Sequence, residues 1–255
     1  MKFALLIGIN YIGTQSELRG CINDIMNIKN ILITKYGYTE ENMRILTDNT
    51  VNKPTKANIL QELTNLQNLD RTKYKQIWIH YSGHGSYVFD NSGDELDGRD
   101  ECICPIDYQD SGVIIDDVLF NIIKSIRIET YIIFDSCHSG TAIDLPFTYD
   151  INVKTFKNNL KPKTKLSSLA IQNPKIIFIS GCKDDQTSAD AYINFSSQGA
   201  MTASLLETLK FYNYKATMRQ LIKNMRTYLQ LNQFTQLPQL STSTDKIQMD
   251  SLFLS

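Results

Sequence analysis

Two segments decide the fold of this chain: QIWIHYSGHG at residues 76–85 and TYIIFDSCHSG at residues 130–140. Each begins with a short apolar run and ends in small and polar residues. Such a run is typical of a buried strand in a parallel sheet. Because parallel sheets carry their chemistry at the carboxyl ends of their strands, we expect the two polar ends to meet at one edge of the sheet. His84 and Cys137 would then lie close together although 53 residues separate them.

Helical patterns alternate with strand patterns along the first half of the chain. Residues 1–10 and 43–47 read as further strands, and isoleucines at helical spacing predict an amphipathic helix over 21–36 that stops at Gly37. Pro54 begins a second expected helix with a buried stripe, and a third begins at residues 116–117. The stripe of the second helix consists of Ile59, Leu60, Leu63 and Leu66.

The second half continues the alternation. Residues 175–180 predict a strand, 199–212 and 217–231 predict helices, and 236–243 and 251–254 are expected to supply edge strands. The whole pattern predicts one α/β domain over residues 1–255, a three-layer α/β/α sandwich with a mostly parallel central sheet.

Two segments lack this periodicity. Residues 83–112 predict a long acidic loop, of a length that is uncommon in compact domains unless it is functional. The polar, lysine-rich stretch 152–173 predicts an exposed linker between a larger part, about 1–150, and a smaller part, about 174–255.

The composition excludes several classes of protein. Lysine and arginine number 26 against 27 acidic residues, so no global field attracts nucleic acid or an anionic membrane. No apolar segment approaches the roughly 18 residues needed to span a bilayer, and the N-terminal apolar run lacks a signal-peptide cleavage site. Five cysteines, an odd number, favour free thiols in a reducing compartment. We therefore expect a cytoplasmic protein.

Cys137 and His84 are the candidate catalytic residues. The thiolate is the nucleophile in cysteine catalysis, and a nearby imidazole makes it available. Cys137 is followed by small and polar residues typical of a sharp turn that exposes a nucleophile. The backbone N–H groups of Gly85 and Cys137 are candidate oxyanion donors.

The other two histidines are weaker candidates. His80 lies within the apolar run and reads as a core histidine with a hydrogen-bond partner. His138 is a competing base, but a side chain adjacent to the nucleophile usually points away from it.

The two segments together resemble the paired active-site signature of metacaspases, which are caspase-like cysteine peptidases. The resemblance covers nearly the whole chain in order, through the further stretches 19–24, 97–107, 115–117, 144–149 and 180–190. It implies a caspase-like sandwich and a cysteine endopeptidase with His84, Cys137 and Gly85 in catalysis. The local Q-A-C-x-G sequence of true caspases is absent, which favours a metacaspase. Since no proline-rich or zinc-finger stretch precedes the first strand, we expect a type I-like catalytic domain without a prodomain.

Carboxylates near the thiol predict the substrate. Asp135 lies two residues before Cys137 on an extended segment, so both face the same side. A carboxylate beside a thiolate raises the thiol pKa unless a cation stands between them, and a substrate lysine or arginine is such a cation. The resemblance implies the same specificity, with Asp24 and Asp135 at the floor of the pocket and Cys21 and Ser82 on its walls. A solvated or helix-dipole role for Asp24 stays open.

The acidic residues between 90 and 101 are by themselves typical of a solvated loop, and their spacing does not fit an EF-hand. The resemblance implies a Ca²⁺ site formed by Asp100, Asp116, Asp117 and Asp144. Four converging carboxylates would repel one another, so Ca²⁺ would order the loops beside the catalytic pair and act as an activator. Cys102 and Cys104 lack the second ligand pair that a zinc site needs.

These features predict a calcium-dependent cysteine endopeptidase that cleaves peptides or proteins after arginine or lysine. We expect a monomer with no nucleic-acid or membrane partner, which is also able to process itself within the lysine-rich linker. Two alternatives remain. An aspartate-specific peptidase would need a pocket arginine, for which only Arg99 is near. A calcium-binding scaffold that has lost catalysis is the other, because a fold can keep its site and serve as a binding module.

Overall fold

The computed structural model describes residues 1–90, 98–136, 143, 145–152, 154–158, 171, 175–181, 190–193 and 196–254. Cys137 and Asp144 lie outside these residues, as does most of the expected linker.

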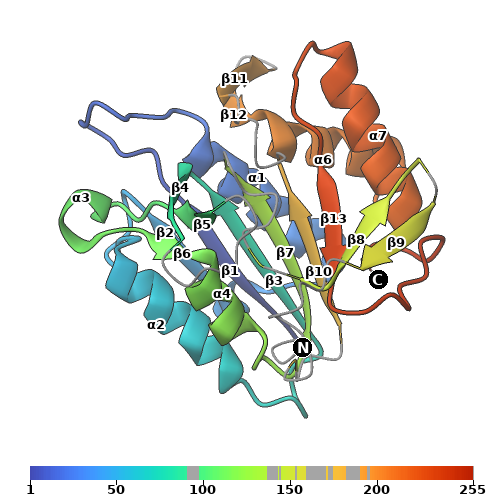
Figure 1. The fold of residues 1–255 in the computed structure, drawn as a ribbon, viewed down its shortest axis with the longest axis horizontal. Helices are drawn as coiled ribbons and strands as arrows, with labels where there is room; N and C mark the ends of the chain where they lie inside the picture. Colours follow the sequence, from blue (N-terminus) through green and yellow to red (C-terminus); the bar gives the residue numbers. More distant parts are fainter. Residues whose placement is uncertain are drawn as a thin grey trace.

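An eight-stranded sheet forms the centre of the molecule (Figure 1). Its strand order is β2 (Met43–Thr47), β1 (Lys2–Gly8), β3 (Gln76–Ser82), β7 (Glu129–Asp135), β10 (Ile176–Ser180), β13 (Gln239–Thr242), β8 (Phe147–Asp150) and β9 (Thr155–Asn158). The first five strands pair in parallel, and the last three join in antiparallel fashion. The mostly parallel central sheet predicted from the sequence is confirmed.

Helices cover both faces of this sheet, as the sequence predicts. On one face, α2 (Lys56–Gln67) and α4 (Asp116–Ile123) pack on strand residues such as Leu5, Ile79 and Phe134. On the other face, α1 (Cys21–Tyr36), α6 (Ala200–Phe211) and α7 (Met218–Leu231) pack on the alternate strand residues. Since successive strand residues point to opposite faces, each strand contributes to both cores. None of the helices in the described residues is long and apolar enough to cross a membrane.

The segment expected to be an acidic loop contains regular structure, so that prediction was wrong. β4 (Gly85–Phe89), β5 (Arg99–Ile103) and β6 (Ile114–Ile115) form a small antiparallel sheet, and the four-residue α3 (Tyr108–Ser111) lies between β5 and β6. Four of the five residues of β5 are buried, and two of these four carry carboxylates. Because buried strand positions are usually apolar, the sequence offered no sign of this strand.

Three smaller differences concern the ends of elements. Helix α2 begins at Lys56 instead of Pro54, because Thr55 is its N-cap and accepts a hydrogen bond from the Asn58 N–H. Strand β13 lies between β10 and β8 and not at an edge of the sheet. Strand β9 occupies residues that were assigned to the linker, and it pairs with β8.

The remaining elements are short. They are the 3₁₀ helix η1 (Glu40–Asn42) and a two-stranded sheet of β11 (Asp190–Ile193) and β12 (Ser196–Gly199). Residues 251–254 form no strand but one isolated bridge, between Leu252 and Thr217.

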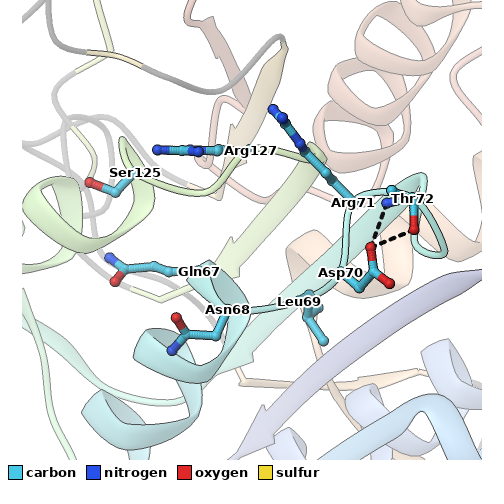
Figure 2. Close-up of a pocket in the computed structure, with 8 residues that line it drawn as sticks. All are labelled: Gln67, Asn68, Leu69, Asp70, Arg71, Thr72, Ser125 and Arg127. Carbon is cyan, nitrogen blue, oxygen red and sulfur yellow. Dashed lines mark hydrogen bonds between the residues drawn. The ribbon is translucent and has the colours of Figure 1, made fainter.

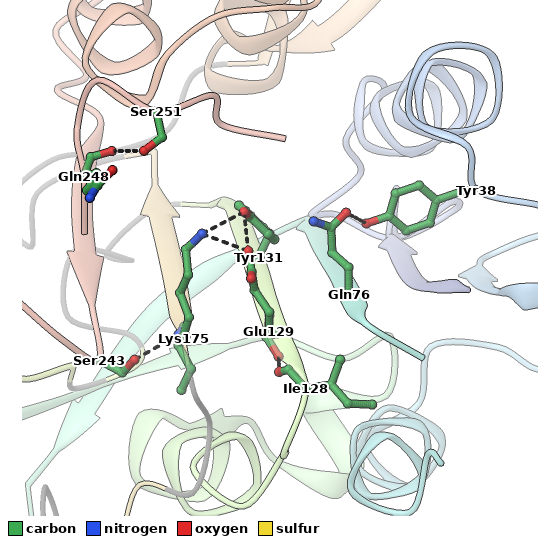
Figure 3. A network of polar contacts seen from close by, with 11 residues as sticks. Tyr38, Gln76, Ile128, Glu129, Tyr131, Lys175, Ser243, Gln248 and Ser251 are labelled. Carbon is green, nitrogen blue, oxygen red and sulfur yellow. Dashed lines mark hydrogen bonds and ion pairs between the residues drawn. The ribbon is translucent and has the colours of Figure 1, made fainter. Parts of the chain in front are cut away.

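A polar cluster ties the starts of β7 and β10 together at the amino-terminal edge of the sheet (Figure 3). The Glu129 carboxylate accepts hydrogen bonds from Lys175 Nζ at 2.8 Å and from the Tyr131 hydroxyl at 2.5 Å. Lys175 Nζ also lies 3.1 Å from the Tyr131 hydroxyl oxygen. The cluster therefore fastens the residue that precedes β10 to the first residue of β7.

Candidate functional site

The carboxyl edge of the sheet brings the two decisive segments together. Strands β3 and β7 are neighbours, and their register sets Ser82 opposite Asp135. Beyond the strands, the Gly83 N–H donates to the Asp135 carbonyl at 3.3 Å. His84 follows Ser82 by two residues, and Cys137 follows Asp135 by two residues in the sequence. The expected meeting of the two strand ends is thus confirmed, although the position of Cys137 itself lies outside the described residues.

The imidazole of His84 is oriented by a backbone carbonyl. Its Nε2 lies 2.8 Å from the Ser16 carbonyl oxygen. Because a carbonyl oxygen only accepts hydrogen bonds, Nε2 carries the proton in this arrangement. The neutral imidazole therefore keeps Nδ1 as its basic nitrogen. The side chain is half-buried, which leaves it accessible from the carboxyl edge of the sheet.

Gly83 allows the chain to turn against two tyrosines. A Cβ atom at this position would lie 2.7 Å from the Tyr81 hydroxyl oxygen and 3.1 Å from that of Tyr11. Both distances are shorter than ordinary van der Waals contact, so a larger residue would push His84 away. Gly85, the candidate oxyanion donor, begins β4 and is half-buried.

A pair of buried carboxylates lies on the opposite face of the same edge. Asp24, in the first turn of α1, is fully buried, and Asp135 is 4% exposed. The Ser82 hydroxyl donates to Asp24 Oδ2 at 2.7 Å. Strand alternation explains the separation of the two centres, because Tyr81 points to the α2 and α4 layer while Ser82 points to the α1 and α6 layer.

The N-terminus of α6 holds both carboxylates. The Gly199 N–H donates to Asp24, 3.0 Å from each carboxylate oxygen, and the Thr202 N–H donates to Asp135 Oδ2 at 2.7 Å. A Cβ atom on Gly199 would lie closer than 3.0 Å to an oxygen of each carboxylate. Oxygen atoms of the two carboxylates are therefore within about 5 Å of each other, a distance at which like charges interact strongly.

This arrangement favours a cationic group near the pair. Helix N-terminal N–H groups stabilise the carboxylates individually, but two negative charges this close still repel each other. Sequence reasoning named Asp24, Asp135 and Ser82, and the structure brings these three together. Cys21 is buried at the first position of α1, three residues before Asp24.

Sequence reasoning missed Gly199 and Thr202. The sequence offers one signal for Gly199: it precedes an apolar helical run, where small residues are common as N-caps. That signal predicts the start of a helix and says nothing about the two carboxylates against which the helix packs.

Three of the four acidic candidates for a metal site lie on the small sheet or directly after it. Asp100 and Asp116 are buried, at 5% and 1% exposure, and Asp117 is half-buried. Asp116 accepts hydrogen bonds from the backbone N–H groups of Glu101 and Asp117, at 3.2 and 2.8 Å. Within the residues that the structure describes, no group of three metal-binding side chains converges. The fourth candidate, Asp144, lies outside them.

Cys102, in β5, and Cys104, directly after it, form a buried thiol pair. Hydrogen bonding to Cys104, together with burial, raises the pKa of the Cys102 thiol. Cys102 therefore stays protonated and unreactive.

A cavity of about 570 Å³ lies elsewhere (Figure 2). The residues that line it belong to the turns that precede β3 and β7 and to the end of α2: Gln67, Asn68, Leu69, Asp70, Arg71, Thr72, Ser125 and Arg127. These turns lie at the amino-terminal ends of the parallel strands, so the cavity is separate from the edge that holds His84 and the carboxylate pair.

Known proteins match this chain over most of its length. A family model for the metacaspase, peptidase C14 domain matches residues 2–146. Metacaspase-1 of Schizosaccharomyces pombe is 38% identical over 286 residues, which cover 94% of this chain and 67% of that protein. The chain belongs to the metacaspase family. It is therefore a cysteine peptidase by family, and His84 and Cys137 stand within the matched residues.

Further relatives agree with this assignment. Metacaspase-1 of Meyerozyma guilliermondii is 39% identical, over 95% of this chain and 69% of that protein. Metacaspase-1B of Aspergillus fumigatus is 37% identical, over 94% and 69%. Among solved structures, a protein from Geobacter sulfurreducens superposes with a TM-score of 0.65 and 25% identity, over 94% of this chain and 92% of that one. The three-layer sandwich of this metacaspase is thus caspase-like.

Proposed function

We propose that this metacaspase domain is an endopeptidase that cleaves after arginine or lysine and that calcium activates it. The observation that carries the proposal is the buried pair Asp24 and Asp135 beside the start of α6. A guanidinium or ammonium group entering between them would relieve the repulsion of the two carboxylates and pair with both. An aspartate side chain in the same place would be repelled.

The arginine considered for an aspartate-specific peptidase does not favour that alternative. The Arg99 guanidinium lies over the ring of Tyr87, 4.1 Å from its centroid, on the small antiparallel sheet. Cation–π contact of this kind occupies the guanidinium.

The proposed reaction is acyl transfer through the thiol. His84 Nδ1 accepts the proton of Cys137 Sγ, and the sulfur attacks the scissile carbonyl carbon. The Gly85 and Cys137 N–H groups stabilise the oxyanion, and the same imidazole then returns the proton to the leaving amine. Water attacks the resulting thioester while Nδ1 takes its proton. The carbon–sulfur bond then breaks, the acid product leaves, and Nδ1 returns the proton to the Cys137 thiolate. The Ser16 carbonyl supports these steps because it keeps the second ring nitrogen, Nε2, protonated.

Calcium activation is supported by the chemistry of the acidic residues at β5 and α4. Asp100 and Asp116 are buried carboxylates on adjacent elements, and Asp117 follows directly. Hard oxygen ligands of this kind suit Ca²⁺, which takes six to eight of them. Asp100, Asp116 and Asp117, with Asp144, are the residues that would hold the ion. Calcium bound there would neutralise the carboxylates next to the strand that follows His84.

We further propose a monomeric, cytoplasmic enzyme that processes itself. The described cysteines Cys21, Cys102 and Cys104 form no disulfide bond, which supports a reducing compartment. The lysine-rich stretch 152–173 offers the cleaved residue type. Incubating the purified chain with calcium and sizing the fragments tests self-processing, and a chain that stays intact while it cuts peptides would exclude it.

One assay tests the main proposal. Fluorogenic peptides that differ only in an arginine, lysine or aspartate at the cleavage site are incubated with the wild type and with Cys137→Ala, with and without calcium. We expect the wild type to cleave the arginine and lysine peptides, and to do so only when calcium is present. Equal signal from Cys137→Ala would refute a Cys137-dependent peptidase and support the scaffold alternative.

A further inference from the structure

The backbone of His84 is held from both sides by two tyrosine hydroxyls. The His84 N–H donates to the Tyr11 hydroxyl oxygen at 3.0 Å, and the His84 carbonyl accepts from the Tyr81 hydroxyl at 2.7 Å. The same carbonyl also accepts from the Cys104 N–H at 3.1 Å. Both tyrosines are buried, at 1% and 0% exposure. The peptide groups on either side of His84 are thus fixed by two buried side chains.

The protons of this network can be assigned. Each phenol has one proton, and the shortest contact of Tyr11 is with the Cys104 carbonyl oxygen, at 2.6 Å. Tyr11 therefore donates to Cys104 and accepts from His84. Tyr81 donates to the His84 carbonyl, its shortest contact. Burial raises the pKa of both hydroxyls well above their ordinary value, so both keep these protons at any working pH.

Tyr11 also contacts the catalytic ring directly. Its ring centroid lies 4.7 Å from that of His84, at an interplanar angle of 39°. The loop that Tyr11 begins supplies the Ser16 carbonyl to His84 Nε2. One loop therefore fixes the backbone of His84, one face of its ring and one of its ring nitrogens.

The backbone of Tyr11 is unusual for a residue of its size. Its φ of 51° lies in the left-handed region, which a bulky side chain rarely adopts. Asp48 holds the chain on both sides of it, since its carboxylate accepts from the Asn10 N–H at 2.8 Å and from the Ile12 N–H at 3.0 Å. Strain of this kind persists only where the surroundings over-determine it, and it occurs often at functional sites.

We propose that Tyr11 and Tyr81 are positioning residues for His84, which fix the orientation of its imidazole and so of Nδ1. This inference rests on the proposed role of His84 as the base. Neither tyrosine exchanges a proton with substrate. Without the two hydroxyls, the His84 N–H would lose its acceptor and the His84 carbonyl would keep the bond from the Cys104 N–H. The backbone of His84 would then be held less firmly, the ring would shift, and proton transfer between ring and thiol would slow.

Tyr11→Phe and Tyr81→Phe test the proposal, because each removes one oxygen atom and keeps the ring. Misplacement of a catalytic group by about 1 Å lowers rates by up to about 100-fold. We expect kcat to fall about 10- to 100-fold in each variant, with KM within about twofold of wild type. The double variant should lose less than the product of the two single losses, because both hydroxyls act on the backbone of one residue.

Tyr38→Phe is the matched control. Tyr38 is equally buried and donates to the Gln76 side chain at 3.0 Å, at the other end of β3. Tyr38→Phe should lower the melting temperature about as much as Tyr11→Phe and Tyr81→Phe do, and should leave kcat unchanged. A Tyr11→Phe variant with the kcat of wild type and the melting temperature of the control would overturn the proposal.

A second measurement does not depend on the substrate. The alkylation rate of Cys137 by iodoacetamide is the rate of the wild type minus that of Cys137→Ala. It reports how readily the imidazole makes the thiolate available. It should fall about 10-fold in Tyr11→Phe and stay unchanged in Tyr38→Phe. If His84→Ala alkylates as fast as wild type, the role of His84 as base fails. If His84→Ala is slow but both tyrosine variants are normal, only the positioning role fails.

Discussion

Replacing Gly199 by alanine should displace the Asp24 and Asp135 carboxylates while leaving the chain folded. The glycine has φ −68° and ψ 135°, a conformation that alanine adopts without strain. The added Cβ would nevertheless lie 2.8 Å from Asp24 Oδ2 and closer still to the Asp135 carboxylate. At least one carboxylate must move, and both are anchored by hydrogen bonds to the start of α6.

The size of the effect follows from those anchors. Loss of one hydrogen bond to a charged group costs about 1.5–3 kcal/mol. If that free energy is lost from binding of the basic side chain, kcat/KM for an arginine peptide falls about 10- to 150-fold, at 1.36 kcal/mol per tenfold change. Overpacking of this kind destabilises the fold by about 1–3 kcal/mol.

The assay compares kcat/KM for an arginine peptide and the free energy of unfolding in Gly199→Ala and in Gly181→Ala. The Cβ of the control substitution would meet Met201 side-chain atoms at 3.2 Å and no carboxylate. We expect similar losses of stability but a much smaller loss of activity in the control. A Gly199→Ala enzyme that cleaves the arginine peptide as fast as wild type would refute the assignment of the pocket.

Three further predictions concern pH, calcium and stability. Burial lowers the pKa of His80 from 6.5 to about 3. Between pH 3 and 6.5 the imidazole is therefore protonated more readily in the unfolded chain than in the folded one. Stability should therefore be full above pH 6.5 and fall by up to about 1.4 kcal/mol per pH unit below it, and His80→Phe should remove this slope in urea titrations. Asp116→Asn should weaken calcium binding at least about 10-fold by calorimetry, whereas Asp70→Asn, an exposed control, should not. Glu129→Gln breaks the ion pair with Lys175 and should lower the free energy of unfolding by about 1 kcal/mol in urea titrations, without changing kcat; a loss of activity with unchanged stability would contradict this.

Sequence reasoning located the elements with strong periodicity. The strands that end before Gly83 and Ser136, and the helix from Cys21 to Tyr36, have the predicted positions because their apolar residues recur at the spacing of a buried strand or an amphipathic helix. Strand β5 was missed because charged residues occupy buried positions in it, and no spacing rule distinguishes such a strand from an acidic loop.

The site was predictable only in part, because much of it comes together from distant parts of the chain. Asp24 and Gly199 are separated by 175 residues and meet through a backbone N–H, which leaves no trace in the residue type. Tyr11 and His84 are separated by 73 residues, and here too a backbone N–H, that of His84, makes the contact. The resemblance to metacaspases named the carboxylates, but it named neither the helix that holds them nor the tyrosines that hold the histidine.

The central claim is that the pair Asp24 and Asp135 selects a basic residue. It is tested most directly by the ratio of kcat/KM for two peptides that differ only in arginine or aspartate at the cleavage site, measured with calcium for wild type and Asp135→Asn. We predict that wild type prefers arginine by at least about 100-fold, since the pocket would attract one side chain and repel the other, and that Asp135→Asn loses most of this preference. Equal cleavage of both peptides by wild type, or an unchanged ratio in Asp135→Asn, would contradict the account.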